Sequence, residues 1–316
     1  MKETNPSPER PSEFDLIRWI RSRVPACPEV PIGIGDDAAA LRLPADALTV
    51  VTTDMLIDGV HFRSAEASPR QVGHKAVARS VSDLAAMAAD GLAVVVAMAA
   101  PPGLTQAYFQ ELFDGMKQAA DALGVRIVGG DIATAEMPLT LTVTAIGSGA
   151  EGRLARRSGA QSGDVLMVTG ELGGSILGRH LRFLPRLREA RWLRETVTLH
   201  AMIDISDGLA ADANHIAEES GVGLEIWEEA VPVSADARAL AANSGGTPLE
   251  HALQDGEDYE LLFTLSSRDA ERLLRRANLP VKLTCIGEVV NGSGLWIRRK
   301  GEPHRPLAPK GWKHLL

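Results

Sequence analysis

Aspartates recur in this sequence at the ends of apolar segments and inside glycine turns. The segment GIGDD (33–37) places two adjacent carboxylates directly behind glycines, and IVGGD (127–131) ends on another. Further aspartates lie in VVTTDMLIDG (50–59), SVSDLAAM (80–87) and MIDISDG (202–208). A solvated helical face would mix Asp, Glu and Lys at helical spacing, whereas glutamate and lysine are nearly absent here. These acids are therefore candidates for chemistry.

Divalent metal binding is the chemistry that this pattern favours. A carboxylate that emerges from an apolar core is costly unless it is paired or bound to a cation, and few lysines lie nearby in the sequence. Short aspartate side chains on rigid turns suit Mg²⁺, which prefers oxygen ligands and often bridges to substrate phosphates. A single aspartate is more often a helix cap or a turn residue, as Asp83 and Asp58 could be. The five segments together favour a metal cluster.

The familiar nucleotide-binding signatures are missing. The chain has no Gly-Lys dipeptide, which excludes a Walker A loop, and no HRD or DFG kinase signature. GIGDDA formally fits the dinucleotide pattern G-x-G-x-x-A, but its paired acids would repel a pyrophosphate and Pro44 interrupts a following helix. A bound phosphate would therefore depend largely on Mg²⁺.

Basic groups and backbone amides could assist such a phosphate. Arg156, Arg157 and Lys75 are the candidate basic groups. The glycine-rich segment GELGGSILG (170–178), between an expected strand and helix, could offer amides to an anion. A tight turn with close packing is the equally favoured alternative for this segment.

Alternating strands and helices are expected to position these residues in the first half of the chain. Apolar periodicity predicts helices over 13–23, 69–89 and 105–123. Alternation and β-branched residues predict strands over 47–54, 92–99, 126–129 and 139–147. LGVRIVGGD predicts a helix stop, a buried strand and a tight turn that delivers Asp131.

The second half shows the same mixture, so the predicted class is α/β or α+β. DVLMVTG predicts a strand, followed by the glycine-rich segment and a helix. A strand-like turn at AMIDISDG and a helix through Ile216 come next, and shorter strands are expected over 222–226, 259–264, 284–287 and 294–297. The Gly-, Ser- and Arg-rich segment near residue 150 is the candidate boundary. It separates an N-terminal domain (13–150) from a C-terminal domain (151–316), with residues 1–12 as a flexible extension.

Composition bounds the class of protein. The chain has 316 residues, 45% of them hydrophobic, and a net charge of -8. The acidic balance argues against nucleic-acid and membrane-surface partners, and the longest apolar run (92–100) is too short to span a bilayer. Cys27 and Cys285 have no metal-ligand spacing and form no disulfide framework. We expect a soluble protein of the reducing cytoplasm.

Taken together, the motifs carry a resemblance to one family. In chain order, GIGDDAAAL, VTTDMLIDGVHF, GHKAVARSVSDLAAMAAD, IVGGD, LARRSG, DISDGLAADANHI, GEDYELLFT and CIGEV resemble the thiamine-monophosphate kinases. They cover most of the chain from Gly33 to Trp312. The family belongs to a superfamily of ATP-dependent enzymes with aminoimidazole ribonucleotide synthetase and selenophosphate synthetase. The resemblance implies the aminoimidazole ribonucleotide synthetase-like fold of two α/β domains, with the N-terminal domains paired in a homodimer.

The resemblance also implies an activity. Members of the family phosphorylate thiamine monophosphate with ATP and Mg²⁺, which gives thiamine diphosphate and ADP and completes thiamine diphosphate biosynthesis. A phosphate acceptor is already ionised near neutral pH, so no strong general base is needed. Catalysis is then expected to consist of positioning and of charge neutralisation by several Mg²⁺ ions during in-line transfer.

Roles for individual residues follow from the resemblance. Metal ligands are implied at Asp37, Thr52, Thr53, Asp54, Asp83, Asp131, Asp204 and Asp207. ATP contacts are implied at Gly130, Asp131, Arg157 and Ser206, and catalytic roles at Asp131 and Asp207. The thiamine phosphate pocket is implied at His61, Glu257 and Trp312, where an acid would face the thiazolium cation. Gln254 and Asp255 depart from the family pattern, and Asp255 would add a charge beside this pocket.

Two kinds of alternative remain at this point. Another superfamily reaction is one: Cys27, in PACPEVP, does not fit the reactive loop of a selenophosphate synthetase, whereas a purine-pathway ligase is harder to exclude. The other is a divalent-cation-binding or nucleotide-sensing protein without enzymatic activity. Such a sensor would bind ATP and Mg²⁺ without producing ADP.

Overall fold

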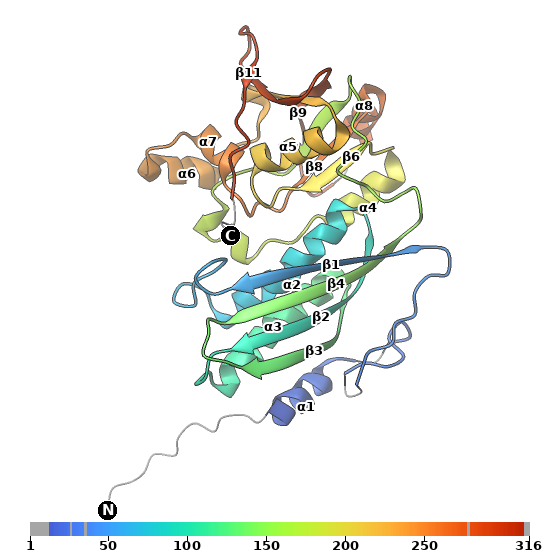
Figure 1. Ribbon diagram of the computed structural model, residues 1–316, viewed down its shortest axis with the longest axis vertical. Helices are drawn as coiled ribbons and strands as arrows, with labels where there is room; N and C mark the ends of the chain where they lie inside the picture. Colours follow the sequence, from blue (N-terminus) through green and yellow to red (C-terminus); the bar gives the residue numbers. More distant parts are fainter. Residues whose placement is uncertain (1–12, 26, 35–36, 277–278, 313–316) are drawn as a thin grey trace, which may run out of the picture. The chain divides into compact units, whose positions relative to one another are not determined.

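The computed structural model describes residues 13–25, 27–34, 37–276 and 279–312. The predicted flexible extension (1–12) lies outside these residues. The chain divides into two compact units (Figure 1): unit 1 comprises Met1–Val81 and Gly91–Ser148, and unit 2 comprises Ser82–Asp90 and Gly149–Leu316. The division falls next to residue 150 but assigns the short segment 82–90 to unit 2. The domain limits 13–150 and 151–316 therefore stay a prediction about independently folding domains.

Unit 1 is a four-stranded sheet with helices on one face (Figure 1). The strand order is β1 (Leu48–Ile57), β4 (Thr140–Gly149), β2 (Asp90–Ala100) and β3 (Arg126–Thr134). The helices are α1 (Glu13–Arg23), α2 (Pro69–Ala86) and α3 (Gln106–Leu123). Helix α3 begins at the N-cap Thr105, whose side chain accepts from Tyr108 N, and ends at the left-handed Gly124. These elements agree with the predicted ones to within a few residues.

The end of β3 differs from the prediction. Asp131 does not follow a tight turn, because β3 continues to Thr134 with Asp131 opposite Ala97 of β2. An ideal Cβ at Gly130 would lie 2.1 Å from the Val96 carbonyl oxygen. The glycine therefore serves the close approach of two paired strands and not a turn. Local glycine content favours a turn, but pairing with β2 outweighs it.

Unit 2 contains a seven-stranded sheet of mixed direction. In spatial order its strands are β11 (Arg305–Pro306), β10 (Gly294–Arg298), β7 (Gly223–Trp227), β9 (Leu283–Val290), β5 (Val165–Thr169), β8 (Leu261–Leu265) and β6 (Ala201–Asp204). Among the strand pairs of this sheet within the described residues, only the β7–β10 pair is parallel. Helix α5 (Leu209–Ser220) packs Leu209, Ala213 and Ile216 into the core of this unit. The mixed α/β class is confirmed.

Several short helices of unit 2 were not predicted. They are α6 (Ala235–Ser244), α7 (Pro248–Gln254), α8 (Ser267–Arg276) and the 3₁₀ turns η1 (Ser175–Leu177), η2 (Arg179–Leu181) and η3 (Glu228–Ala230). The predicted helix after the glycine-rich segment is α4 (Leu187–Thr196). Helix α7 begins with a capping box between Thr247 and Glu250, with Pro248 next to the cap. That signal was present in the sequence as TPLE. No helix of the described residues is both long and apolar enough to cross a membrane.

Candidate active site

Asp54 on β1 is one half of an ion pair. Its Oδ1 lies 3.2 Å from Nε of Arg79, which projects from α2. Its Oδ2 is buried and has no hydrogen-bond partner among the described residues. The sequence around Asp54 contains few basic residues and gave no sign of this partner, because Arg79 lies more than twenty residues away. Asp54 Oδ2 could therefore serve as a ligand atom for a cation.

The side chains of Thr53 and Asp54 face opposite sides of the sheet. The Thr53 Oγ1 lies 3.2 Å from Thr144 Oγ1 on β4, whereas Asp54 reaches Arg79 on the helical side of the sheet. Successive side chains of a strand point to opposite faces. The implied set Thr52, Thr53 and Asp54 therefore cannot act on one ion through three side chains.

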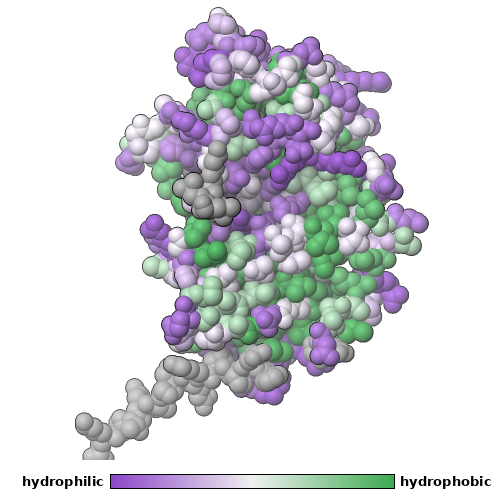
Figure 2. Space-filling model, viewed as in Figure 1, coloured by the Kyte–Doolittle hydropathy of each residue, from purple (hydrophilic) through white to green (hydrophobic). Residues whose placement is uncertain are grey.

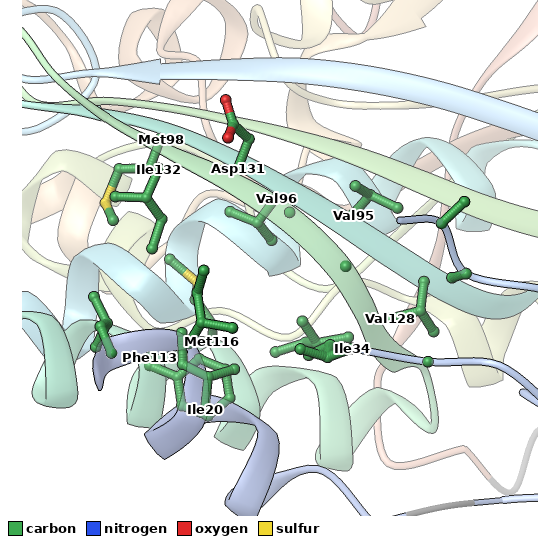
Figure 3. A pocket seen from close by; sticks show the side chains of 18 of the residues that line it. Ile20, Ile34, Val95, Val96, Met98, Phe113, Met116, Val128, Asp131 and Ile132 are labelled. Carbon is green, nitrogen blue, oxygen red and sulfur yellow. The ribbon is translucent and has the colours of Figure 1, made fainter. Parts of the chain in front are cut away.

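Asp37, Gly130 and Asp131 line the same cavity in unit 1, and Figure 3 shows this cavity with Asp131 labelled. The cavity has a volume of about 860 Å³ and lies between α1, residues 33–34 and 37–41, α3 and strands β2 and β3. Its walls are apolar, with Ile20, Ile34, Val96, Phe113, Met116 and Ile132 among the lining residues. The carboxylate of Asp131 points away from these apolar side chains (Figure 3). Asp36, the first acid of GIGDD, lies outside the described residues.

Asp54 and Asp131 lie on opposite edges of the sheet of unit 1. Asp54 belongs to β1 and Asp131 to β3, with β4 and β2 between them. Neighbouring strands are spaced so that three steps span roughly 14 Å, whereas Mg²⁺ holds its ligands at about 2.1 Å. The two carboxylates of one copy therefore do not bind the same ion.

His61 and Lys75 are engaged in structural hydrogen bonds. Nδ1 of His61 accepts from the backbone N–H of Ile57 at 3.1 Å. The carbonyl oxygen of His61 accepts from Nζ of Lys75 at 2.6 Å. Lys75 is fully buried, so the suggestion that it meets a phosphate is wrong. The lysine instead holds the loop that carries His61.

In unit 2, Asp204 ends β6 and is nearly fully buried. Oγ of Ser82 donates to Asp204 Oδ2 at 2.6 Å. The next residue, Asp83, lies in the last turn of α2, so it is not a helix N-cap. A carboxylate at a helix C-terminus is disfavoured by the helix dipole. The SDLAAM and DISDG motifs are thus linked through Ser82.

Asp212 and His215 on α5 were not predicted from the sequence. Asp207, Asp212 and His215 each offer one ligand atom, and these atoms lie within 4.8 Å of one another. Burial raises the pKa of the Asp212 carboxyl well above its ordinary range, and the charges of Asp204 and Asp207 raise it further. The negative charges of Asp204, Asp207 and Asp212 act on one another, and such a group of acids favours a bound cation. The i, i+3 spacing of Asp212 and His215 on a predicted helix was the available signal.

Two further segments meet the DISDG turn. The backbone N–H of Glu257 donates to Ser206 O at 2.7 Å, and that of Trp312 donates to Asp207 O at 2.9 Å. The Trp312 side chain is half exposed. The structure therefore brings Ser206, Asp207, Glu257 and Trp312 together around one turn.

The glycine-rich segment 170–178 has no amides to offer at its centre. The N–H of Gly173 donates to Asp258 Oδ2 at 2.8 Å, and that of Gly174 donates to Asp255 Oδ2 at 2.9 Å. Ideal Cβ atoms at the two glycines would lie 2.7 and 2.4 Å from the nitrogens of Ala252 and Ala237. Close packing, and not anion binding, accounts for these glycines.

Asp255 is held by its neighbours and does not face a pocket as an isolated charge. Besides Gly174, its carboxylate lies 3.0 Å from Nδ1 of His251. Asp258 is buried beside Arg179; burial raises its pKa to about 8, although Arg179 opposes the shift. Glu260 forms a two-point pair with Arg186 at 2.7 and 2.6 Å. The contacts of these acids attach the 254–260 segment to its neighbours.

Arg157 lies on the exposed segment that follows the boundary of the units. Its carbonyl oxygen accepts from Ser220 Oγ at 3.2 Å, and the carbonyl of Arg156 accepts from Met202 N at 2.7 Å. The backbone of the RRSG motif is thereby attached to β6, the strand that carries Asp204. The Arg157 guanidinium is left exposed.

Comparison with known proteins defines the class first. Residues 35–148 match the AIR synthase related protein, N-terminal domain, and residues 174–299 match its C-terminal domain. Each match lies chiefly within one unit of the structure. The fold and the acidic motifs thus define a two-domain protein of the AIR synthase related class.

Relatives that match nearly the whole chain show the family. The chain is 39% identical over 309 residues to the thiamine-monophosphate kinase of Rhodopirellula baltica, covering 96% of this chain and 97% of that protein. The crystal structure of thiamine-monophosphate kinase from Stenotrophomonas maltophilia K279a aligns with a TM-score of 0.79 at 34% identity, covering 90% and 96%. A structure of AaThiL complexed with AMPPCP and TMP aligns at 0.76 and 32%, covering 96% and 97%. The chain belongs to the thiamine-monophosphate kinase family, which confirms the resemblance.

Proposed function

We propose that this protein transfers the γ-phosphoryl group of ATP to thiamine monophosphate, forming thiamine diphosphate and ADP. The observation that carries the proposal is the DISDG turn, where Asp204, Asp207 and Asp212 converge and where Glu257 and Trp312 are attached. A relative at 32% identity over 96% of this chain has been solved complexed with AMPPCP, an ATP analogue, and TMP. The aspartates that would bind a metal ion and the glutamate that would face the thiazolium ring are thus placed at one turn.

Mg²⁺ fits the residues present. In unit 2, burial raises the pKa of Asp212, and the charges of Asp204 and Asp207 raise it further. In unit 1, Asp54 keeps a buried oxygen without a hydrogen-bond partner among the described residues. We assign metal binding to Asp37, Asp54, Asp83, Asp131, Asp204 and Asp207, and we add Asp212. When bound, Mg²⁺ neutralises phosphate charge and orients the transferred group.

The cavity of unit 1 suits the base of ATP. Its apolar walls would bury a purine ring, and Gly130 is among the residues that line it. Asp37 and Asp131 at the same cavity would meet the metal-bound phosphates. We assign phosphate contacts to the exposed, cationic Arg157 and to Ser206, as the resemblance implies.

The residues around the acceptor have electrostatic roles. Glu257 supplies a negative charge to the thiazolium ring, and Trp312 supplies an aromatic face to it. We assign His61 to the same substrate, as the resemblance implies. The acceptor phosphate is ionised near neutral pH, so these residues bind and orient it and need not remove a proton.

We further propose that the protein acts as a homodimer through the sheet of unit 1. On β1, Val51 and Met55 expose 62% and 51% of their surface, and Figure 2 shows apolar side chains gathered over this sheet. Covering such a face with a second copy would bury it. Free Cys27 and Cys285 accord with a cytoplasmic enzyme.

Product identification tests the proposed function. Purified protein is incubated with ATP, MgCl₂ and thiamine monophosphate, and products are separated by mass-resolved chromatography. We expect thiamine diphosphate and ADP in equal amounts, and no product with a chelator or with free thiamine as the acceptor. Tight ATP binding without thiamine diphosphate would refute the proposal and favour a sensor or a related ligase.

A further inference from the structure

His180 lies against Glu257, the acid assigned to the substrate cation. Nδ1 of His180 is 3.0 Å from Glu257 Oε2, and the two side chains are 7% and 23% exposed. An ionised carboxylate only accepts hydrogen bonds, so Nδ1 is the ring nitrogen that carries the proton and donates. The histidine is therefore a buried donor to a carboxylate that remains partly open to solvent.

The backbone of Glu257 is held in an unusual conformation. Its φ is +64°, and that of Tyr259 is +52°, a region that residues other than glycine rarely occupy. The N–H groups of these residues donate to Ser206 O and Ile205 O at 2.7 and 2.8 Å. Such a conformation persists where the surroundings fix it. Here those surroundings are the DISDG turn, so the Glu257 side chain starts from a rigid backbone.

His180 is itself rigidly placed by its neighbours. Arg179 donates to Glu171 O, to Gly173 O and to Asp258 Oδ1 at 2.8, 2.9 and 2.7 Å. Two positions beyond η2, Phe183 stacks on Tyr259 with ring centroids 4.0 Å apart. The histidine is thus anchored on both sides to the segment that contains Glu257.

The type of partner distinguishes Glu257 from the two buried acids of its segment. Asp258 and Glu260 pair with Arg179 and Arg186, and an arginine keeps its positive charge at all ordinary pH values. A histidine orients a carboxylate through one ring N–H and lacks the permanent positive charge of an arginine. The contact with His180 therefore fixes the Glu257 rotamer without placing a permanent positive charge beside the carboxylate.

We propose that His180 is a positioning residue that holds the Glu257 carboxylate for the cationic half of the substrate. This inference rests on the proposed function. It predicts a specific effect, because His180 acts on the contact with the cation and not on the nucleotide. Loss of His180 should weaken binding of thiamine monophosphate and leave ATP binding unchanged.

Steady-state kinetics of two variants test the proposal. We expect His180→Ala to raise KM for thiamine monophosphate about tenfold, with KM for ATP unchanged and kcat within about twofold. His180→Asn, whose amide can donate from near the Nδ1 position, should restore most of the affinity. His200→Ala is the matched control, because His200 makes a similar pair with Asp164 at 2.8 Å elsewhere in unit 2.

A neutral competitor separates positioning from general damage. A thiamine monophosphate analogue with an uncharged ring should inhibit wild type and His180→Ala equally, because it gains nothing from Glu257. Equal weakening of the charged and uncharged ligands would overturn the proposal, as would an unchanged KM in folded His180→Ala. If His180→Ala does not fold, then His180→Asn must bind thiamine monophosphate within about threefold of wild type, and weaker binding would refute the role.

Failure of the proposed function has a different signature. Wild-type protein that forms no thiamine diphosphate refutes the function, whatever the variants do. Calorimetric titration of thiamine monophosphate into wild type and His180→Ala then still reports on His180. Equal dissociation constants would refute the positioning role.

Discussion

The carboxylate of Asp212 holds the turn that carries Asp207. Its Oδ2 accepts from the backbone N–H of Asp207 at 3.0 Å and from that of Gly208 at 3.1 Å. Asp212 is almost fully buried, and it lies one helical turn into α5. The acid therefore plays two parts: it fixes the geometry of the turn, and it adds negative charge to the group formed by Asp204 and Asp207.

The charge of Asp212 makes the stability of the metal-free protein depend on pH. An acid whose pKa is higher in the folded chain than in the unfolded chain binds more protons when folded, so stability falls as pH rises. Burial raises the pKa of Asp212 well above its ordinary value. The fall therefore begins near pH 4 and ends at the raised pKa. We expect Tm in a chelator to fall less with pH in Asp212→Asn than in wild type.

Mg²⁺ should reduce this fall, because a cation favours the ionised carboxylates and stabilises the folded state that binds it. Asp46→Asn, at an exposed position, is the matched control and should follow wild type. Parallel Tm profiles for wild type and Asp212→Asn, with and without Mg²⁺, would contradict this account.

Mixing of inactive variants tests whether two copies share a site. Asp131→Asn alone should lower kcat by roughly a thousandfold with an unchanged circular dichroism spectrum, and Asp54→Asn should behave similarly. If Asp54 of one copy acts with Asp131 of its partner, each mixed dimer regains one intact site. Random exchange should then restore about a quarter of wild-type activity.

Size-exclusion chromatography with light scattering supplies the accompanying control. Mixtures of Asp131→Asn with itself must stay inactive. A dimer whose mixtures never regain activity would contradict the shared site, and a monomer that turns over at the full rate would contradict the homodimer as well.

Filling the cavity of unit 1 should affect one substrate only. Met116 lines the cavity from α3 and is 5% exposed. Met116→Trp would place a larger ring in the space assigned to the base of ATP, so we expect KM for ATP to rise roughly tenfold and KM for thiamine monophosphate to stay constant. Met98→Leu, a volume-conserving change at the same cavity, should leave both values unchanged. If Met116→Trp raised KM for thiamine monophosphate and left KM for ATP unchanged, the assignment of this cavity to the base of ATP would be wrong.

The Arg186–Glu260 pair should contribute to stability rather than to catalysis. The Glu260 side chain is 4% exposed and accepts from two nitrogens of Arg186. Arg186→Leu leaves a buried carboxylate uncompensated, which costs about 3 kcal/mol. Urea denaturation should report this loss. Arg186→Leu combined with Glu260→Gln should recover much of it, and a double variant as unstable as Arg186→Leu would argue against the pair as the cause.

Local pattern accounts for most of the secondary structure. Helix α3 was predictable because its apolar spacing, its Thr105 cap and Gly124 all lie within the segment itself. The capping box of α7 carried the same kind of information. The end of β3 was not predictable, since its continuation through Asp131 depends on pairing with β2, more than thirty residues earlier in the chain.

The sequence by itself determined the family, the acidic motifs and the mixed α/β class, because each depends on residue type and short-range spacing. Only the tertiary structure decided which polar groups meet. Arg79 reaches Asp54, Ser82 reaches Asp204 across more than one hundred residues, and the amides of Gly173 and Gly174 are taken by Asp258 and Asp255. A side chain's partner depends on how distant segments pack, and spacing along the chain does not encode that packing. His180 was identifiable beside Glu257 only after η2 had folded onto the 254–260 segment.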